Sequence, residues 1–257
     1  MQIGDPNIIA AGTGITTVAD FRRRDLALGG EGAPLLPPFH QWMFSDKNTN
    51  RVVLNIGGIA NITILPAGSD KVTGFDTGPG NILLDSWIQE SKRKRFDRNG
   101  NWAKSGKIVS ELLELLLRDP YFIQPPPKST GFEYFNLMWL RQALSDIGVI
   151  KQADIQSTLC ALTARSITDA IRIYAPNTKQ LLVCGGGIEN TELIRWITSE
   201  LPLVEVCSTG KFGLEPNWVE AAAFAWLAKR CLDGEPSNLP SVTGADYTGI
   251  LGGIYRA

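Results

Sequence analysis

Histidine, cysteine and long apolar runs are all scarce in this sequence of 257 residues. The single histidine, His40, excludes His-rich metal sites, and no G-x-S-x-G motif is present to support a Ser-His-Asp triad. The four cysteines are widely spaced and form no C-x-x-C pair, which excludes zinc knuckles and dithiol redox motifs. We therefore expect chemistry based on carboxylates and bound phosphate, with buried free thiols at Cys160, Cys184, Cys207 and Cys231.

An excess of positive charge is also missing, since 25 Lys and Arg residues face 26 Asp and Glu residues. A protein surface that binds nucleic acid needs a basic excess, so this class of partner is excluded. No apolar run approaches the length of about 18 residues that a membrane span needs. The first residues, MQIGDPNIIAAGTG, lack the basic and apolar regions of a secretory signal. These features predict a cytoplasmic protein whose partner is a small molecule.

Glycine and proline divide the chain into alternating strand-like and helix-like segments, without an internal repeat. β-Branched and apolar runs predict strands at residues 16–20, 51–56, 59–65, 71–75, 180–184 and 204–207. Apolar residues at helical spacing predict helices at residues 81–90, 105–118, 155–174, 190–201 and 217–231, the last of them buried because it is apolar on nearly every face. Residues 29–39 and 125–131 are expected to be loops. A hairpin-rich group of strands followed by alternating strands and helices predicts a mixed α/β fold.

Three glycine-rich turns each follow an apolar strand. They are NIGGIAN at 55–61, FDTGPGN at 75–81 and CGGGIEN at 184–190, and the last two also lead into helices. Glycine lets backbone N–H groups converge on an anion, and the N-terminus of a helix favours phosphate. One such turn is an ordinary joint between strands, but three together favour the binding of nucleotide phosphates. Neither G-x-G-x-x-G nor G-x-x-x-x-G-K-[ST] is present, so the chain is not a recognisable Rossmann or P-loop protein.

Asp76 lies between a predicted strand and a glycine loop that opens a predicted helix. A carboxylate in that position can act as a general base on a hydroxyl or a water molecule beside a bound phosphate. Alternatively, it can cap its own turn by accepting hydrogen bonds from the following backbone. Spacing alone favours neither interpretation.

Six segments, in order, resemble the signature segments of the anhydro-N-acetylmuramic acid kinases. They are VADFRRRDLALGGEGAPL, LNIGGIANIT, GFDTGPGN, PPPKSTG-x-x-x-FN, LLVCGGGIEN and GLEPNWVEAAAFAWLA, and the resemblance extends from Ile3 to the closing LGGIYRA. It implies an actin/hexokinase-like (ribonuclease H-like) ATPase lobe with a mixed β-sheet flanked by helices. Residues 1–48 would be the remnant of an N-terminal sugar-kinase lobe, and residues 49–257 would be the C-terminal nucleotide-binding lobe.

The resemblance also implies a reaction. Members of the family use ATP and Mg²⁺ to convert 1,6-anhydro-N-acetylmuramic acid and water into N-acetylmuramic acid 6-phosphate, in the recycling of cell-wall peptidoglycan. Asp76 would be the base that activates water against C1, while the sugar O6 takes the γ-phosphoryl group.

Further binding residues follow from the same resemblance. Glu220 would lie near the sugar, although a carboxylate in the first turn of a helix is also a common structural placement. Asp20, Arg22 and Arg24 would contact sugar or phosphate, although consecutive arginines are often a solvated face. Lys128 and Thr130 are interpreted as surface residues. Nucleotide contacts are expected from Asn55, Gly57, Gly58, Gly78, Gly80, Asn81, Gly185, Gly186, Gly187 and Asn190.

In one respect the sequence departs from the family pattern. Full-length relatives begin with a further segment that carries a phosphate loop rich in glycine, serine and threonine, whereas this chain starts at MQIGDP. We therefore expect an incomplete copy of the kinase, with the first lobe incomplete. The alternative is a non-catalytic sugar- or nucleotide-binding module derived from the kinase, for example as half of a homodimer. The presence of both Asp76 and Glu220 favours the kinase.

Overall fold

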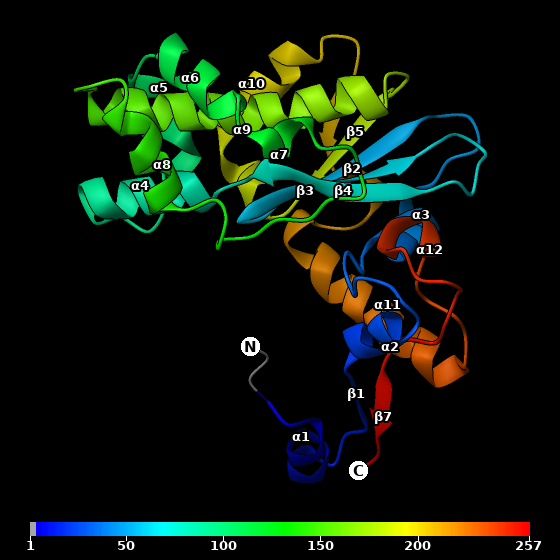
Figure 1. Cartoon of the computed structure of the whole chain (residues 1–257). Helices are drawn as coiled ribbons and strands as arrows, with labels where there is room; N and C mark the ends of the chain where they lie inside the picture. Colours follow the sequence, from blue (N-terminus) through cyan, green and yellow to red (C-terminus); the bar gives the residue numbers. More distant parts are fainter. Residues whose placement is uncertain (1–3) are drawn as a thin grey trace.

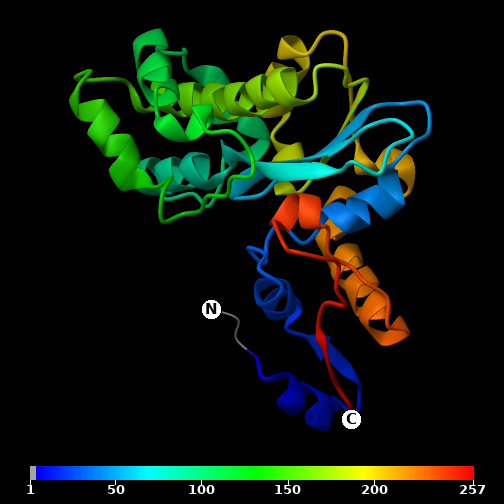
Figure 2. The same ribbon diagram turned by 45° about the vertical axis from the view of Figure 1, so that its right-hand side comes forward.

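A computed structural model describes residues 4–257, which form a large unit built on a β-sheet and a smaller unit below it (Figure 1). Residues 1–3, where the resemblance and the expected 1–48 segment begin, lie outside the described residues. The smaller unit, named here the terminal unit, consists of α1, β1, α2 and β7. The two units are connected by the long helix α11, and α1 and β7, from opposite parts of the sequence, lie together in the terminal unit (Figure 2). The bounds of these elements are α1 Pro6–Thr13, β1 Thr17–Ala19, α2 Phe21–Ala27, α11 Val219–Asp233 and β7 Gly253–Tyr255.

The large unit contains a five-stranded sheet in the order β4-β3-β2-β5-β6. The pairs β2/β3 and β3/β4 are antiparallel, whereas β2/β5 and β5/β6 are parallel. The chain reaches β5 from β4 through a series of helices, as a parallel connection requires. The sheet combines parallel and antiparallel pairs, so the prediction of an α/β fold with a mixed sheet is confirmed. The strands are β2 Arg51–Ile56, β3 Ile59–Leu65, β4 Thr73–Pro79, β5 Gln180–Cys184 and β6 Glu205–Ser208.

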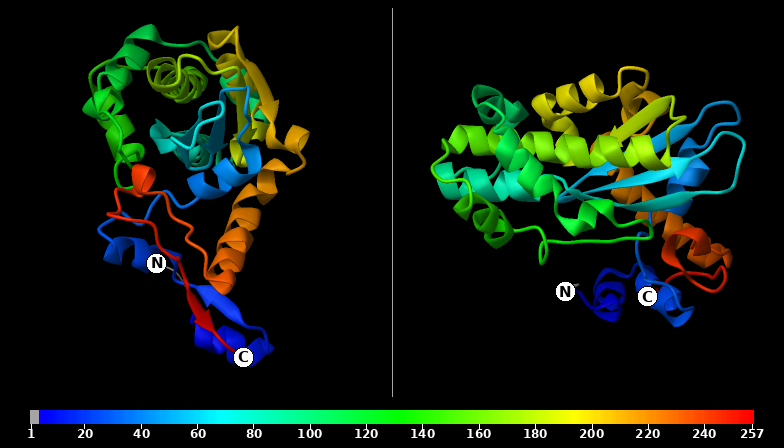
Figure 3. Two further views of the ribbon diagram at one scale, coloured as in Figure 1. Left: turned by 90° about the vertical axis from the view of Figure 1, so that its right-hand side faces the viewer. Right: turned by 45° about the horizontal axis from the view of Figure 1, so that its top comes forward.

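Helices cover both faces of the sheet (Figure 3). Alternate residues of β2 point to opposite faces: Val52, Leu54 and Ile56 pack with α9 and its neighbours, and Val53 packs with α3 and α11. Burial of both faces explains why these strands are apolar at nearly every position. The remaining helices are α3 Pro37–Phe44, α4 Ile82–Lys92, α5 Asn101–Ser105, α6 Ser110–Leu117, α7 Pro120–Ile123, α8 Leu137–Ser145, α9 Gln152–Tyr174, α10 Thr191–Glu200 and α12 Pro240–Thr243. Four 3₁₀ turns lie at η1 Arg98–Gly100, η2 Gly186–Glu189, η3 Thr209–Phe212 and η4 Pro216–Trp218.

Three local predictions are wrong in their bounds. The strand expected at 71–75 instead continues to Pro79, because Asp76 and Gly78 still pair with β3 across an irregularity between Ala60 and Asn61. The helix expected at 105–118 is interrupted at Gly106, where a Cβ would lie 2.1 Å from the carbonyl oxygen of Ala153. The loop expected at 29–39 ends early, because prolines at 37 and 38 open α3, a position where the missing N–H costs nothing.

The prediction of a buried final helix is also wrong. In α11 the buried residues are Val219, Ala223, Leu227 and Cys231, which form a single stripe at every fourth position. The helix contacts α3, β1 and β7. Phe224 and Trp226 beside the stripe are half-buried, whereas Glu220, Lys229 and Leu232 are exposed. The preceding Trp218 is 65% exposed. The apolar composition of this helix therefore does not indicate that all of its faces are buried.

The structure agrees with the expected free thiols and with the lack of long apolar runs in the sequence. Cys160, Cys184 and Cys231 are buried, Cys207 is half-buried, and all four are free thiols. Within residues 4–257, no helix combines the length and the apolar character needed to cross a membrane.

Asp25 connects the N-terminal and C-terminal parts of the chain. Its carboxylate is fully buried and accepts hydrogen bonds from the N–H of Gly32 (2.8 Å), the amide of Asn238 (2.9 Å) and the hydroxyl of Thr243 (2.8 Å). Asp25, the second aspartate of VADFRRRD, is therefore a structural residue. Its buried carboxylate, with three donors, fixes the loop after α2 against residues 238–243.

Asp25→Ala is expected to lower the free energy of unfolding by about 2–3 kcal/mol, because three buried donors lose their acceptor. Urea denaturation followed by circular dichroism measures this loss. Asp5→Ala is a suitable control, because the Asp5 carboxylate also accepts backbone hydrogen bonds but lies at the surface. Equal stability of the two variants would contradict the structural role of Asp25.

Candidate functional site

The three glycine-rich turns meet at one end of the sheet. The carbonyl oxygen of Gly58, in the turn between β2 and β3, accepts from the N–H groups of Gly80 (2.9 Å) and Ile82 (3.0 Å). The carbonyl of Gly57 accepts from the N–H of Asn81 (2.8 Å). The third turn follows β5, which is parallel to β2 and pairs Cys184 with Asn55. The structure thus brings together all ten residues expected to contact nucleotide.

These glycines divide into two groups by their surroundings. At Gly78, Gly80, Gly185 and Gly187, an added Cβ would lie 2.8 Å or less from a neighbouring atom, so these positions are closely packed. Around Gly57 and Gly58 the nearest atoms lie 3.5 Å or more away, and around Gly186 nothing lies within 4 Å. The second group therefore leaves room for a ligand, and the first lets the turns approach one another.

Asn81 and Asn190 differ in their use of the side-chain amide. The side chain of Asn190 accepts from the N–H of Leu193 and so caps α10. Asn81 occupies the N-cap position of α4, but its side chain makes no capping hydrogen bond. Its amide instead donates to the carbonyl of Ile56 (3.3 Å), which ties α4 to the end of β2.

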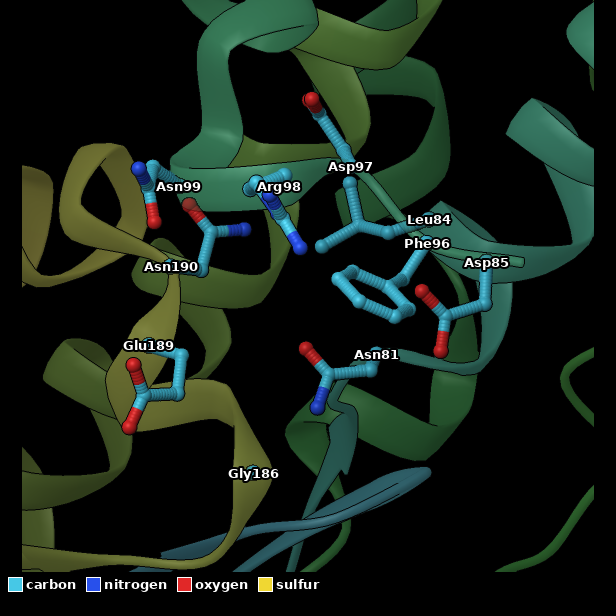
Figure 4. A pocket seen from close by; sticks show the side chains of 10 residues that line it. All are labelled: Asn81, Leu84, Asp85, Phe96, Asp97, Arg98, Asn99, Gly186, Glu189 and Asn190. Carbon is cyan, nitrogen blue, oxygen red and sulfur yellow. The ribbon is translucent and has the colours of Figure 1, made fainter. Parts of the chain in front are cut away.

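A pocket of about 440 Å³ opens beside these turns (Figure 4). Its lining includes Asn81, Gly186 and Asn190, three of the expected nucleotide-binding residues. It also contains a group that sequence reasoning missed, in which the ring of Phe96 is surrounded by polar and charged side chains (Figure 4). This group consists of Asp85, Phe96, Asp97, Arg98 and Asn99.

Asp97 and Asp85 have different roles in this pocket. The Asp97 carboxylate accepts from the N–H groups of Trp102 (2.9 Å) and Ala103 (2.8 Å) and so holds the start of α5. No hydrogen bond to the Asp85 side chain is found within residues 4–257. Burial, followed by the nearby Asp97 carboxylate, raises the pKa of Asp85 to about 6. Asp85 is therefore a carboxyl group that can change its charge near neutral pH.

The raised pKa of Asp85 predicts a pH-dependent stability. Between about pH 4 and pH 6 the folded chain holds this proton and the unfolded chain has lost it, so stability falls as pH rises through this interval and is then constant. Asp85→Asn is expected to remove this fall and to be the more stable protein above pH 6. Urea denaturation from pH 4 to pH 8 measures it, with the exposed Asp146→Asn as the control. Parallel curves for wild type and Asp85→Asn would contradict the assignment.

Asp76 lies on β4, an edge strand of the sheet. One oxygen of its carboxylate, Oδ2, accepts from the hydroxyl of Ser129 (3.1 Å) and the N–H of Thr130 (3.0 Å). Both partners come from the proline-rich segment more than 50 positions away in the sequence, so the interpretation of Asp76 as a cap of its own turn is wrong. The other oxygen, Oδ1, makes no hydrogen bond within the part of the chain that the structure describes.

Burial raises the pKa of Asp76 above its ordinary value, and the hydrogen bonds from Thr130 and then Ser129 offset part of that rise. A half-buried carboxylate with one free oxygen and a raised pKa is more basic than a solvated carboxylate. The geometry therefore suits a general base.

Lys128 and Thr130, interpreted from the sequence as surface residues, belong to this site. The ammonium group of Lys128 donates to the carbonyl of Tyr121 (3.0 Å) and lies 4.7 Å from the centre of the Tyr121 ring. Burial lowers the pKa of Lys128. No local pattern in the sequence signals these contacts, because they depend on the path of the chain back to β4.

Within residues 4–257, none of the residues expected to bind sugar makes a hydrogen bond to Asp76. Asp20 begins α2 with a left-handed backbone (φ 65°) and pairs with Arg23 at 3.2 Å. Arg22 donates to the carbonyl of Gly32 (2.8 Å), and Arg24 is exposed. Glu220 is exposed in the first turn of α11. It lies close enough to Cys184 to add to the rise that burial causes in the pKa of that thiol, which places Glu220 beside the third glycine turn.

A family model and curated relatives identify the same family. The family model described as anhydro-N-acetylmuramic acid kinase matches residues 1–257. The chain is 55% identical to a protein of that name from Shewanella amazonensis, covering 100% of this chain and 69% of the relative. It is 53% identical to one from Coxiella burnetii, covering 99% of this chain and 68% of the relative. A solved activator of 2-hydroxyisocaproyl-CoA dehydratase from Clostridium difficile superposes with a TM-score of 0.42 and 18% identity, covering 80% of this chain and 70% of that one. The chain belongs to the anhydro-N-acetylmuramic acid kinase family.

Proposed function

We propose that this protein is an ATP-dependent kinase that converts 1,6-anhydro-N-acetylmuramic acid and water into N-acetylmuramic acid 6-phosphate, in the cytoplasmic recycling of peptidoglycan. Family membership supports the reaction class. The observation that carries the proposal is the free Oδ1 of Asp76, on the edge strand of the sheet that also holds the glycine turns.

In the proposed mechanism, a water molecule attacks C1 of the sugar through its oxygen, and Oδ1 of Asp76 takes a proton from that water. The bond between C1 and O6 breaks, and O6 forms a bond to the γ-phosphorus of ATP while ADP leaves. Each of these steps is mainly a matter of position and charge, as is general for phosphoryl transfer. The raised pKa of Asp76 favours transfer of the proton to the carboxylate.

The nucleotide is proposed to place its base in the pocket of Figure 4 and its phosphates at the open turn residues Gly57, Gly58 and Gly186. Phe96 is 57% exposed, and its ring offers a stacking surface for a base. The guanidinium of Arg98 offers charge to the same ligand. The closely packed Gly78, Gly80, Gly185 and Gly187 are proposed to shape the site by letting its turns approach one another.

Mg²⁺ is proposed to arrive with the nucleotide. This cation takes oxygen ligands, commonly from phosphates and water with one or two carboxylates. Residues 4–257 contain no group of three or more candidate ligands, which fits a cation bound largely by ATP and water. Bound there, it would neutralise developing charge on the phosphates.

Sugar binding is proposed for Asp20, Arg22, Arg24 and Glu220. Arginines suit this sugar because its lactyl carboxylate can accept paired hydrogen bonds from a guanidinium group. The division at residues 48 and 49 and a homodimeric assembly also remain proposals. The pairing of β1 with β7 shows that the terminal unit draws on both ends of the chain.

The test is ³¹P NMR of the purified chain with ATP, Mg²⁺ and 1,6-anhydro-N-acetylmuramic acid. A sugar 6-phosphate signal that depends on the sugar supports the proposed reaction. Tight binding of the sugar by calorimetry without any product would contradict it and favour a binding module instead.

A further inference from the structure

The segment from Pro120 to Thr130, named here the strap, engages Asp76 at three of its four polar atoms. The N–H of Asp76 donates to the carbonyl of Lys128 (3.2 Å), and the carbonyl of Asp76 accepts from the hydroxyl of Tyr121 (2.7 Å). The carboxylate oxygen Oδ2 accepts from Ser129 and Thr130. In Figure 1 this segment starts at α7 and runs along β4. Asp76 is therefore fixed in both backbone and side chain by one segment.

The strap is itself anchored away from the carboxylate. Lys128 donates to the carbonyls of Tyr121 (3.0 Å) and Phe122 (3.4 Å), so it closes the strap on itself. Phe122 packs so closely over Gly78 that a Cβ there would lie 2.8 Å from its ring. These contacts hold the strap on β4 independently of Ser129, whose side chain is exposed and donates only to Asp76 within the described residues.

We propose that Ser129 is a positioning residue for Asp76: its hydroxyl, with the N–H of Thr130, holds Oδ2 so that Oδ1 is the oxygen that receives the proton. This inference rests on the proposed function of Asp76 as base. With two donors on Oδ2, rotation of the carboxylate about its terminal torsion would break two hydrogen bonds. With Thr130 alone, one hydrogen bond would resist the same rotation, so the two oxygens would exchange roles more freely.

The first test is a titration of the Asp76 carboxyl carbon by ¹³C NMR in the whole chain, with the signal assigned by its loss in Asp76→Asn. Ser129→Ala is expected to move the midpoint upward by about 0.5–1 pH unit, since a hydrogen bond to the charged form is lost. Ser129→Thr keeps a hydroxyl and is expected to restore the wild-type midpoint. Ser145→Ala is the matched control, because this exposed serine at the end of α8 donates to the neighbouring Asp146 carboxylate and to the carbonyl of Gln142, and makes no hydrogen bond to Asp76. An unchanged midpoint in Ser129→Ala would overturn the proposal.

The second test uses the ³¹P assay across pH. Ser129→Ala is expected to lower kcat about 3- to 30-fold with KM unchanged and to move the acidic limb of the profile upward, and Ser129→Thr is expected to recover most of the loss. A loss of equal size in the threonine variant would overturn the proposal. Full turnover in Asp76→Asn would refute the base itself, whereas the NMR midpoint would still decide whether Ser129 holds the carboxylate.

Discussion

Replacing Asp76 by asparagine is expected to lower kcat by about 10²- to 10⁴-fold, the range that a general base contributes. Asparagine has nearly the same shape, and its carbonyl oxygen can accept from Ser129 and Thr130 as Oδ2 does. Its amide nitrogen then takes the place of Oδ1 and has no free electron pair to receive a proton. The structure is therefore expected to persist while proton transfer is lost.

The measurement for Asp76→Asn is the initial rate of sugar 6-phosphate formation, with ATP affinity determined separately by calorimetry. Asp70→Asn is the control, because Asp70 is an exposed carboxylate that accepts a hydrogen bond from Gln41. A rate within threefold of wild type would eliminate Asp76 as the base. Loss of ATP affinity together with the rate would instead indicate damage to the glycine turns.

Gly185→Ala is expected to lower the free energy of unfolding by about 3–5 kcal/mol, a large share of the total for a domain of this kind. The backbone of Gly185 has φ 79° and ψ 170°, a region that is nearly restricted to glycine. A Cβ there would also lie 2.4 Å from Oδ1 of Asn55 and 2.8 Å from the carbonyl oxygen of Ile56. Neither neighbour can withdraw easily, because Asn55 and Ile56 are part of β2.

Gly186→Ala, one residue along, is the matched control for Gly185→Ala. Nothing lies within 4 Å of its added methyl group, so its stability is expected to stay within about 1 kcal/mol of wild type. Because Gly186 lines the pocket, the same methyl group is expected to weaken nucleotide binding. Guanidinium denaturation separates the two variants, and equal stabilities would show that the turn is not as closely packed as described.

Local sequence patterns predicted the central hairpin and the long helix α9, because their apolar spacing is set by neighbours within a few residues. The strands at 51–56 and 59–65 match β2 and β3 at both ends. The end of β4 could not be placed so well. Glycine and proline in GFDTGPGN suggested that the strand ends early, whereas pairing with β3 continues the strand through them.

The candidate site was less accessible to sequence reasoning than the fold. Its glycines are visible as motifs, but the partners of Asp76 come from residues 53 and 54 positions further along the chain. The segment around Phe96 is rich in lysine and arginine, which indicates a solvated loop unless its return to the glycine turns is known. Composition likewise suggested a buried α11, since a sequence alone does not show that only the stripe at Val219, Ala223, Leu227 and Cys231 is buried in this helix.

The strap has a second consequence, for association between molecules. β4 is an edge strand, and unpaired N–H and C=O groups on such a strand invite the addition of a strand from another chain. Lys128 and Tyr121 occupy the backbone N–H and carbonyl of Asp76, so this part of the edge presents no free pairing groups. Loosening the strap would therefore do more than misplace a carboxylate: it would uncover a template for intermolecular β-pairing.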